Sequence, residues 1–152
     1  MIIILIIILE DVVKKYSKKR EAILNQIRST TAHPSAEWVY NALKPKYPDL
    51  SLATVYRNIA SFVKEGKIIS VGVVDGQERY DGTTADHAHF ICSHCGRILD
   101  VDVPSANYAL IDQSVTCADP IQITRHELTF RGVCAKCSRE KAPTSDLPQS
   151  TI

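Results

Sequence analysis

Two pairs of cysteines with the same spacing constrain the fold of this chain more than any other feature. Each pair has the form Cys-x-x-Cys, and the pairs are Cys92 with Cys95 and Cys134 with Cys137. A tight turn can direct both sulfurs of such a pair at one point. The 38 residues between the pairs must therefore fold back if all four sulfurs are to meet, and this length has room for a helix and a strand.

Four thiolates suit a structural zinc ion, which prefers tetrahedral coordination and needs no redox chemistry. Gly96 follows the second cysteine, where such a turn often requires a positive φ. No convincing secretory signal is present, so we expect a reducing, cytoplasmic environment in which paired cysteines bind metal instead of forming disulfides. A redox switch and an iron–sulfur cluster are the alternatives for the quartet. The fifth cysteine, Cys117, is expected to pack within a buried helix.

Histidine and aspartate side chains form a second set of candidate ligands beside the first cysteine pair. His87 and His89 are one residue apart, so on a strand both rings point to the same side. Asp81 ends the stretch "ERYD", and Asp100 ends the strand expected after the first cysteine pair. Nitrogen and oxygen donors suit iron(II) or manganese(II), with zinc as a competitor. The sequence therefore predicts two metals sorted by ligand chemistry, with zinc in sulfur and an exchangeable ion in nitrogen and oxygen.

The first half of the chain carries the apolar spacing of three helices. The first is expected over residues 10–29, and the second begins near "HPS", where Pro34 suits a first helical turn and Trp38 belongs to the buried face. The third is expected to run from Ser51, a good N-cap, to Gly66, a good C-terminal stop.

After the third helix the apolar spacing changes, and Asp75-Gly76 between two β-prone stretches predicts a hairpin. Three helices followed by a two-stranded hairpin are typical of a winged helix-turn-helix. Residues 1–67 hold eleven Lys and Arg against six Asp and Glu, which favours a polyanion such as DNA. A plain core helix with a solvated polar face is the alternative for the third helix. The residues expected to contact DNA are Thr54, Tyr56, Arg57, Asn58, Lys18 and Arg20.

The second half is expected to contain strands at 88–92 and 97–101, a helix from Ser105 to Cys117, and a strand at 121–130. The fold class is therefore α+β. We expect a winged-helix domain at residues 1–81, a metal-binding domain at 82–138 and a flexible tail at 139–152.

The chain begins with the apolar stretch "MIIILIIIL". It is too short to span a bilayer, which takes about 20 residues. We expect an extension of the first helix, with a membrane or partner contact as the alternative, and no membrane association of the whole protein.

Five segments together resemble the ferric uptake regulator superfamily: "HPSAEWVYNAL", "SLATVYRNI", "ERYD", "DHAHFICSHCGRILDV" and "GVCAKC". The resemblance runs from about residue 12 to 138. It implies a homodimeric, metal-dependent transcriptional repressor, not an enzyme, with a C-terminal α/β dimerisation domain and a double-stranded operator of two-fold symmetry. It also implies that His33 joins Asp81, His87, His89 and Asp100 in the regulatory site.

Within that superfamily, iron sensors usually have glutamates at the two carboxylate positions, whereas Asp81 and Asp100 resemble the peroxide-responsive repressors. That branch implies that bound iron(II) reacts with hydrogen peroxide, that His33 or His87 is oxidised, and that DNA is released. Manganese would give an insensitive repressor. A repressor of metal uptake without peroxide chemistry is the alternative, and a His/Asp metalloenzyme or a metal-storage module are less favoured.

An additional metal site of some relatives would need ligands where this chain has Asp86, Ala88 and Asn107, so we expect no third site. His126, the one residue that fits, is expected to be structural. His94 is expected to be an exposed turn residue.

Overall fold

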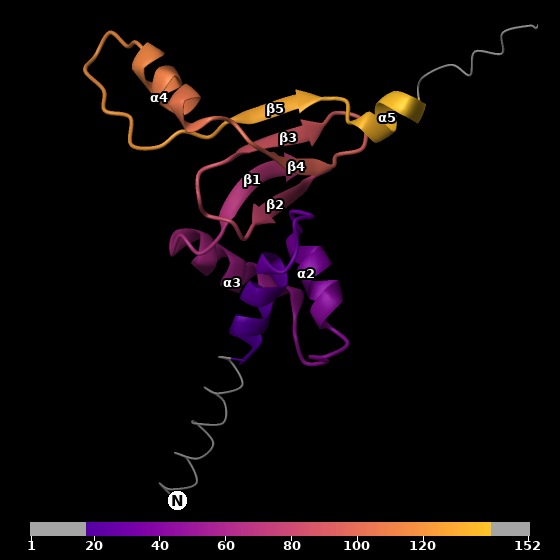
Figure 1. Cartoon of the computed structure of the whole chain (residues 1–152). Coiled ribbons are helices and arrows are strands. Elements are labelled where there is room, and N and C mark those ends of the chain that lie inside the picture. The colour runs from indigo at the N-terminus through magenta and orange to yellow at the C-terminus, as the bar shows by residue number, and fades with distance from the viewer. Residues whose placement is uncertain (1–17, 141–152) are drawn as a thin grey trace, which may run out of the picture. The chain divides into compact units, whose positions relative to one another are not determined.

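The computed structural model describes residues 18–140 (Figure 1). The chain divides into two compact units between Asp86 and His87, called here unit 1 and unit 2. The predicted domain boundary after Asp81 falls at the end of the last strand of unit 1. The apolar stretch at the N-terminus and most of the predicted tail lie outside the described residues. Within residues 18–140, no helix combines the length and the apolar content that crossing a membrane requires.

The described part of unit 1 starts in a helix at residues 18–28, followed by α2 (Ala36–Leu43) and α3 (Leu52–Lys64). The hydroxyl of Ser35 accepts a hydrogen bond from the Trp38 amide and caps α2. Pro34 therefore precedes the cap, and the prediction that it occupies the first turn is wrong. Ser51 caps α3 in the same way, as predicted, and the helix is followed by Gly66 with φ +66°.

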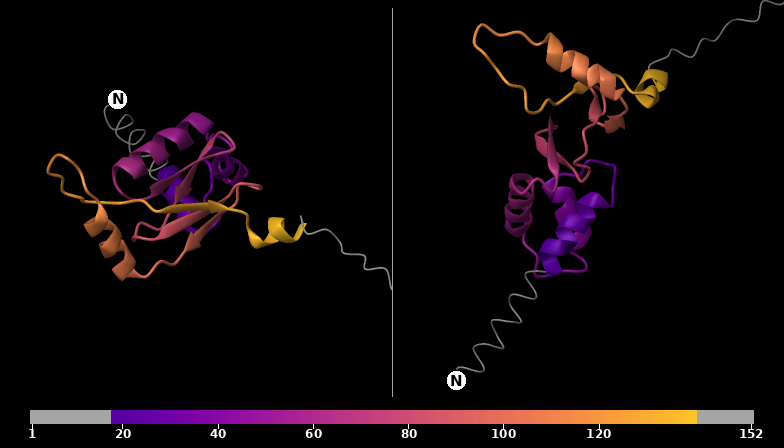
Figure 2. Two further views of the ribbon diagram at one scale, coloured as in Figure 1. Left: turned by 90° about the horizontal axis from the view of Figure 1, so that it is seen from above. Right: turned by 60° about the vertical axis from the view of Figure 1, so that its left-hand side comes forward.

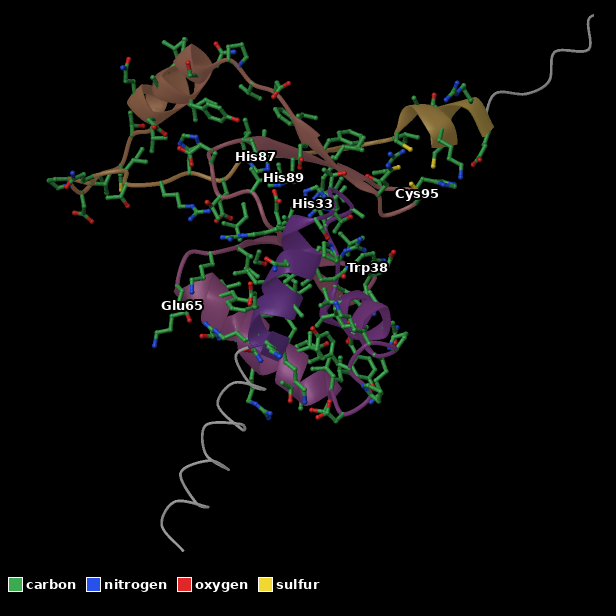
Figure 3. All side chains as sticks on the ribbon, turned by 60° about the horizontal axis from the view of Figure 1, so that its bottom comes forward. His33, Trp38, Glu65, His87, His89 and Cys95 are labelled. Atoms are coloured by element: carbon green, nitrogen blue, oxygen red, sulfur yellow. The ribbon has the colours of Figure 1, made fainter. Side chains whose placement is uncertain are left out.

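The core of unit 1 lies between these helices and the hairpin. Ala36, Val39 and Leu43 form the buried face of α2. Trp38, labelled in Figure 3, is 43% exposed, so its predicted place in the core is wrong. Successive residues lie about a quarter-turn apart around a helix, so Trp38 does not share the buried face of its neighbour Val39. The other fully buried apolar residues of this core are Ile23, Ile27, Leu50, Val55, Ile59, Phe62 and Ile68.

The predicted hairpin is present as β1 (Ile69–Val74) and β2 (Gln77–Asp81), which pair antiparallel. Asp75 and Gly76 connect them with φ of 52° and 75°, the left-handed conformation that a two-residue turn of this kind requires. Ile69 pairs with Asp81, so the hairpin ends on a carboxylate. Three helices followed by this hairpin give unit 1 the architecture of a winged helix, as predicted.

Unit 2 contains a three-stranded sheet in the order β4-β3-β5, with β3 (Ala88–Cys92) in the centre (Figure 1). β4 (Ile98–Val101) pairs antiparallel with β3, and β5 (Thr129–Gly132) pairs parallel with it. The helix α4 (Ser105–Ser114) connects β4 to β5 through a long open loop (Figure 2). A short helix, α5 (Ala135–Glu140), follows the sheet.

Two predictions for unit 2 are wrong, and one helix was missed. The strand predicted at 121–130 begins only at Thr129, because Thr129 pairs with His89 and the residues before β3 form no strand to which residues 121–128 could pair. Cys117 is exposed and lies beyond the end of α4, which has no buried residue and hence no core for a thiol to join. The helix α5 was not predicted. His94 is exposed in its turn, as predicted.

Candidate metal centres

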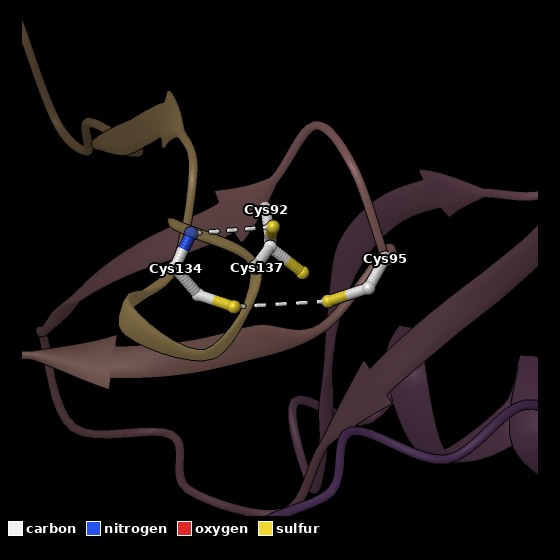
Figure 4. A group of neighbouring side chains, drawn as sticks. All are labelled: Cys92, Cys95, Cys134 and Cys137. Atoms are coloured by element: carbon white, nitrogen blue, oxygen red, sulfur yellow. Dashed lines mark hydrogen bonds between the residues drawn. The ribbon is translucent and has the colours of Figure 1, made fainter. Parts of the chain in front are cut away.

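The four paired cysteines meet at one end of the sheet of unit 2 (Figure 4). Cys92 is the last residue of β3 and Cys95 lies in the turn that follows, whereas Cys134 and Cys137 belong to the segment that enters and begins α5. The turn closes through a hydrogen bond of 3.0 Å from the Gly96 amide to the Cys92 carbonyl. All four sulfurs lie within 4.8 Å of one another.

The sulfur spacing fits a single tetrahedral ion. A zinc–sulfur bond of about 2.3 Å in a regular tetrahedron places sulfurs about 3.8 Å apart. The Sγ atoms of Cys95 and Cys134 are 3.8 Å apart, and the cysteines are free thiols. The predicted quartet is thus brought together with the donor set and the spacing of a structural zinc site.

Two sulfurs of the quartet have opposite pKa shifts. The Cys134 amide donates to the Cys92 sulfur at 3.3 Å, and this bond is the main reason that the pKa of Cys92 is lowered to about 6. Burial raises the pKa of Cys137 to about 12. A divalent cation amid the sulfurs would favour the thiolate of every cysteine, so metal binding would release protons and weaken as the pH falls.

In unit 2, three nitrogen and oxygen donors converge where β3 and β4 pair. The Nε2 atoms of His87 and His89 are 3.0 Å apart (both labelled in Figure 3). His89 lies opposite Asp100 in the register of the strands, and the Asp100 carboxylate is 3.6 Å from His87 and 3.7 Å from His89. The alternation of side chains along β3 therefore directs both imidazoles to one carboxylate, as the spacing predicted.

In unit 1, two donors meet at the end of β2. The His33 Nε2 atom is 3.7 Å from a carboxylate oxygen of Asp81, and both side chains are buried. The other Asp81 oxygen accepts a hydrogen bond of 2.7 Å from the Thr83 amide. Spacing alone did not identify His33, because it is 48 residues from its carboxylate neighbour; only the family resemblance indicated it.

The structure thus divides the five predicted regulatory ligands between the units. His33 and Asp81 form a buried pair in unit 1, and His87, His89 and Asp100 form a partly exposed triad in unit 2. Both groups consist of imidazole and carboxylate, which bind iron(II), manganese(II) or zinc.

The predicted DNA-contacting residues fall into two groups. Tyr56 is 44% exposed on α3 and donates its hydroxyl to the Glu37 carboxylate of α2. That bond is the main cause of a raised Tyr56 pKa and a lowered Glu37 pKa. The exposed Arg57 contacts the Thr54 hydroxyl at 3.2 Å, and Lys18 is exposed.

Asn58 and Arg20 instead connect the helix at residues 18–28 to α3. The Asn58 side chain is buried, donates to the Thr54 carbonyl at 2.8 Å and accepts from Arg20 at 3.1 Å. The Arg20 guanidinium also lies 4.4 Å from the Phe62 ring centroid. Both side chains therefore take part in the packing of unit 1, although a quarter of the Arg20 side chain remains exposed.

His126 has the surroundings of a structural residue. Its ring stacks on Tyr108 with centroids 4.8 Å apart, and its Nδ1 atom is 2.9 Å from the Asp112 carboxylate. These contacts hold the segment before β5 against α4.

Comparisons with known proteins found a matching family model and similar relatives. The sequence model of the ferric uptake regulator family matches residues 12–131. The chain is 34% identical over 127 residues to the peroxide operon regulator of Bacillus subtilis, with 84% of this chain and 86% of that protein covered. It is 32% identical over 126 residues to the peroxide-responsive repressor PerR of Staphylococcus epidermidis, with 83% of each covered.

Solved structures with a similar fold include two regulators. The Campylobacter jejuni peroxide stress regulator matches with a TM-score of 0.70 and 25% identity, over 88% of this chain and 98% of that one. The ferric uptake regulator of Francisella tularensis with iron matches with a TM-score of 0.66 and 26% identity, over 78% of this chain and 90% of that one.

Proposed function

Because this chain belongs to the ferric uptake regulator family, we propose that it is a metal-responsive transcriptional repressor in which an exchangeable cation controls DNA binding. The observation that carries this proposal is the division of the ligands. The winged-helix unit supplies His33 and Asp81, and the other unit supplies the triad of His87, His89 and Asp100. Neither group alone fills the coordination of iron(II) or manganese(II). A cation that takes ligands from both groups would stabilise one arrangement of the two units over others.

The finer proposal is that the protein senses hydrogen peroxide. Bound iron(II) would activate hydrogen peroxide next to its ligands, and the two electrons that reduce the peroxide to water would come in net from the imidazole that gains the oxygen. His33 and His87 are the rings proposed to be oxidised, and an imidazole that gains an oxygen on a ring carbon becomes a poorer nitrogen donor. Support comes from the aspartates at positions 81 and 100, and from relatives named as peroxide regulators at 32–34% identity.

DNA recognition is proposed for α3. Tyr56 and Arg57 are exposed near its N-terminal end, where side chains of a recognition helix reach base edges. The Arg57 guanidinium suits guanine or phosphate, and the Tyr56 ring can pack against a thymine methyl group. Two copies of the chain related by a two-fold axis would present two such helices to an operator of the same symmetry.

The second copy is proposed to cover the apolar side chains that unit 2 exposes. α4 buries none of its own residues, and Leu110 on this helix is 63% exposed. Ile121 and Phe130 are exposed to 55% and 44%. Exposed apolar side chains on a small unit favour a protein partner, and a second copy of the same chain is the commonest such partner.

The experiment that tests metal control uses a DNA fragment selected from random sequences by the manganese-loaded protein. We expect binding to be lost when a chelator removes manganese but leaves zinc in place, and to return on adding manganese. Replacing Arg57 by Ala should weaken binding by about tenfold or more, because a base or phosphate contact is lost in each copy. Equal affinity of the loaded and the stripped, zinc-retaining protein would refute metal control.

Peroxide sensing is tested on the same complex. Dilute peroxide should release DNA from the iron-loaded protein and add one oxygen to the peptide that carries His33 or His87, as read by mass spectrometry. The manganese-loaded protein should keep both its DNA and its mass. Oxidation confined to cysteines would leave a metal-responsive repressor of the alternative kind, without histidine chemistry.

A further inference from the structure

An arginine of the hairpin donates hydrogen bonds to the backbone at His33 and at the residue before it. Arg79 lies on β2, and its Nε atom donates a hydrogen bond to the His33 carbonyl. Its Nη2 atom donates to the Ala32 carbonyl at 3.0 Å. One planar guanidinium thus holds two successive carbonyls of a segment that lies 46 residues earlier in the chain.

The segment that Arg79 holds has an unusual conformation at His33. The φ of His33 is +49°, in the left-handed region that residues with a Cβ atom rarely occupy. The next residue of β2 holds the backbone on the C-terminal side of His33, because the Tyr80 amide donates a hydrogen bond of 3.1 Å to the Pro34 carbonyl. Asp81, which follows on the same strand, is the carboxylate 3.7 Å from the His33 ring. Three successive residues of β2 therefore fix the backbone around His33 and provide its carboxylate neighbour.

We propose that Arg79 is a positioning residue of the regulatory metal site. It keeps the His33 backbone left-handed, and this conformation directs the imidazole to the Asp81 carboxylate. The inference rests on the proposed function, because it takes His33 and Asp81 as metal ligands. Residues that orient ligands in this way typically change metal affinity by about 10- to 100-fold when they are replaced.

Arginine suits this position because its donors form a rigid fork. Lysine carries the same charge but has one compact ammonium, which cannot reproduce two directed hydrogen bonds to neighbouring carbonyls. Charge and geometry also predict opposite effects on metal affinity. A guanidinium near a cation opposes binding electrostatically, so loss of its charge alone would strengthen metal binding, whereas loss of its positioning would weaken it.

The test measures manganese(II) binding to the full-length, zinc-loaded protein and to its Arg79→Lys and Arg79→Met variants. We expect about tenfold or more weaker binding in both. The matched control is Lys44→Met, which removes another cation-to-carbonyl bond of unit 1, from Lys44 Nζ to the Leu50 carbonyl at 2.8 Å. The control should bind manganese as the wild type does. Unchanged binding in the Lys variant together with tighter binding in the Met variant would overturn the proposal.

A second measurement separates failure of this inference from failure of the proposed function. In the zinc-loaded protein without manganese, the backbone carbon-13 and amide chemical shifts of His33 report its φ. We expect both Arg79 variants to lose the left-handed signature at His33 while the amides of α3 stay in place. A wild type that binds no manganese would refute the metal site. An unmoved His33 in both folded variants would refute the role of Arg79, whatever the metal result.

Discussion

Cys95 lies in an exposed turn, whereas its three partners in the sulfur cluster are buried. Its sulfur is nevertheless 3.8 Å from that of Cys134, so Cys95 is placed to be the fourth ligand of a tetrahedral ion. The sheet of unit 2 has only three short strands and its helix α4 buries none of its residues, so little apolar packing supports this unit. The sulfur cluster must therefore contribute much of its stability.

We expect Cys95→Ser to lose zinc and, with it, the fold of unit 2. Binding of structural zinc contributes on the order of 10 kcal/mol to folding in small zinc domains, and a hydroxyl is a poor substitute for a thiolate ligand. The matched control is Cys117→Ser, which changes the exposed cysteine outside the cluster. Elemental analysis should find one zinc per chain in the control and little in the variant. Stoichiometric zinc in Cys95→Ser would contradict the assignment.

Single residues also show where sequence reasoning stops. The cysteine quartet and the triad of His87, His89 and Asp100 follow from local spacing, because turns and alternating strands place those side chains together. The burial of Asn58 depends on Arg20, 38 residues away, and no periodicity reveals such a bond. His33 adopts a left-handed φ that is set by partners on β2, and this too leaves no local signal.

Among the elements, α3 has an ionic network at its C-terminal end. Glu65, labelled in Figure 3, is 2.6 Å from the Lys67 ammonium and 2.5 Å from the Arg20 guanidinium. The Ser61 hydroxyl donates to the same carboxylate. Hydrogen bonds from Lys67, Ser61 and Arg20, in that order, lower the pKa of Glu65 from 4.5 to about 2. The network connects the end of α3 to the helix at residues 18–28.

The network should make the stability of unit 1 depend on pH. A carboxylate whose pKa is lowered on folding stabilises the fold fully above its unfolded pKa of 4.5 and loses that contribution as the pH falls towards about 2. Glu65→Gln should therefore be less stable than the wild type at pH 6, and the difference should shrink steadily between pH values of about 4.5 and 2. Urea unfolding followed by fluorescence of Trp38, the one tryptophan of the chain, measures it.

Glu21→Gln is the control for this experiment, because Glu21 is exposed on the helix at residues 18–28. Its difference from the wild type should be small and independent of pH in the same range. Since Glu65 is solvent-exposed, added salt should reduce the effect of Glu65→Gln. A difference that stays constant down to pH 2 would count against the network.

At this scale, prediction succeeded where one element determines its own limits. Caps and apolar spacing located α3, and a two-residue turn located the hairpin. Prediction failed for β5 because its start is set by where β3 begins. It failed for α5 because that helix is six residues long and starts between the cysteines of the second pair. There the path of the backbone is set by the position of the sulfurs more than by helix propensity.

For the whole molecule, the sequence predicts two domains with a boundary after Asp81, and the structure divides into two units after Asp86. Basic residues and helical spacing precede Asp86, and paired cysteines and strands follow it. The α+β class is therefore confirmed. The partner proposed for α4 would belong to the assembly, and within a single chain the only sign of it is the apolar side chains that remain exposed on unit 2.

We expect Leu110→Glu to dissociate the proposed dimer. Burial of a leucine contributes about 1.5–3 kcal/mol, and a two-fold interface would bury two, so the dimer dissociation constant should rise about 100-fold or more. Gln113→Glu, on the same helix and also exposed, adds the same charge without removing an apolar group. Light scattering or sedimentation measures the dissociation constant. A dimer that survives Leu110→Glu unchanged would exclude α4 from the interface.

The parallel pairing of β3 with β5 places the two cysteine pairs at the same end of the sheet, although 38 residues of chain separate them. During translation, the ribosome therefore releases the winged helix and the first cysteine pair well before the second pair emerges. The winged-helix unit can fold before the last two cysteines of the other unit have been synthesised. A cell short of zinc would then accumulate newly made molecules in which unit 1 is folded and unit 2 is not. Proteases would cleave the unfolded unit 2 first.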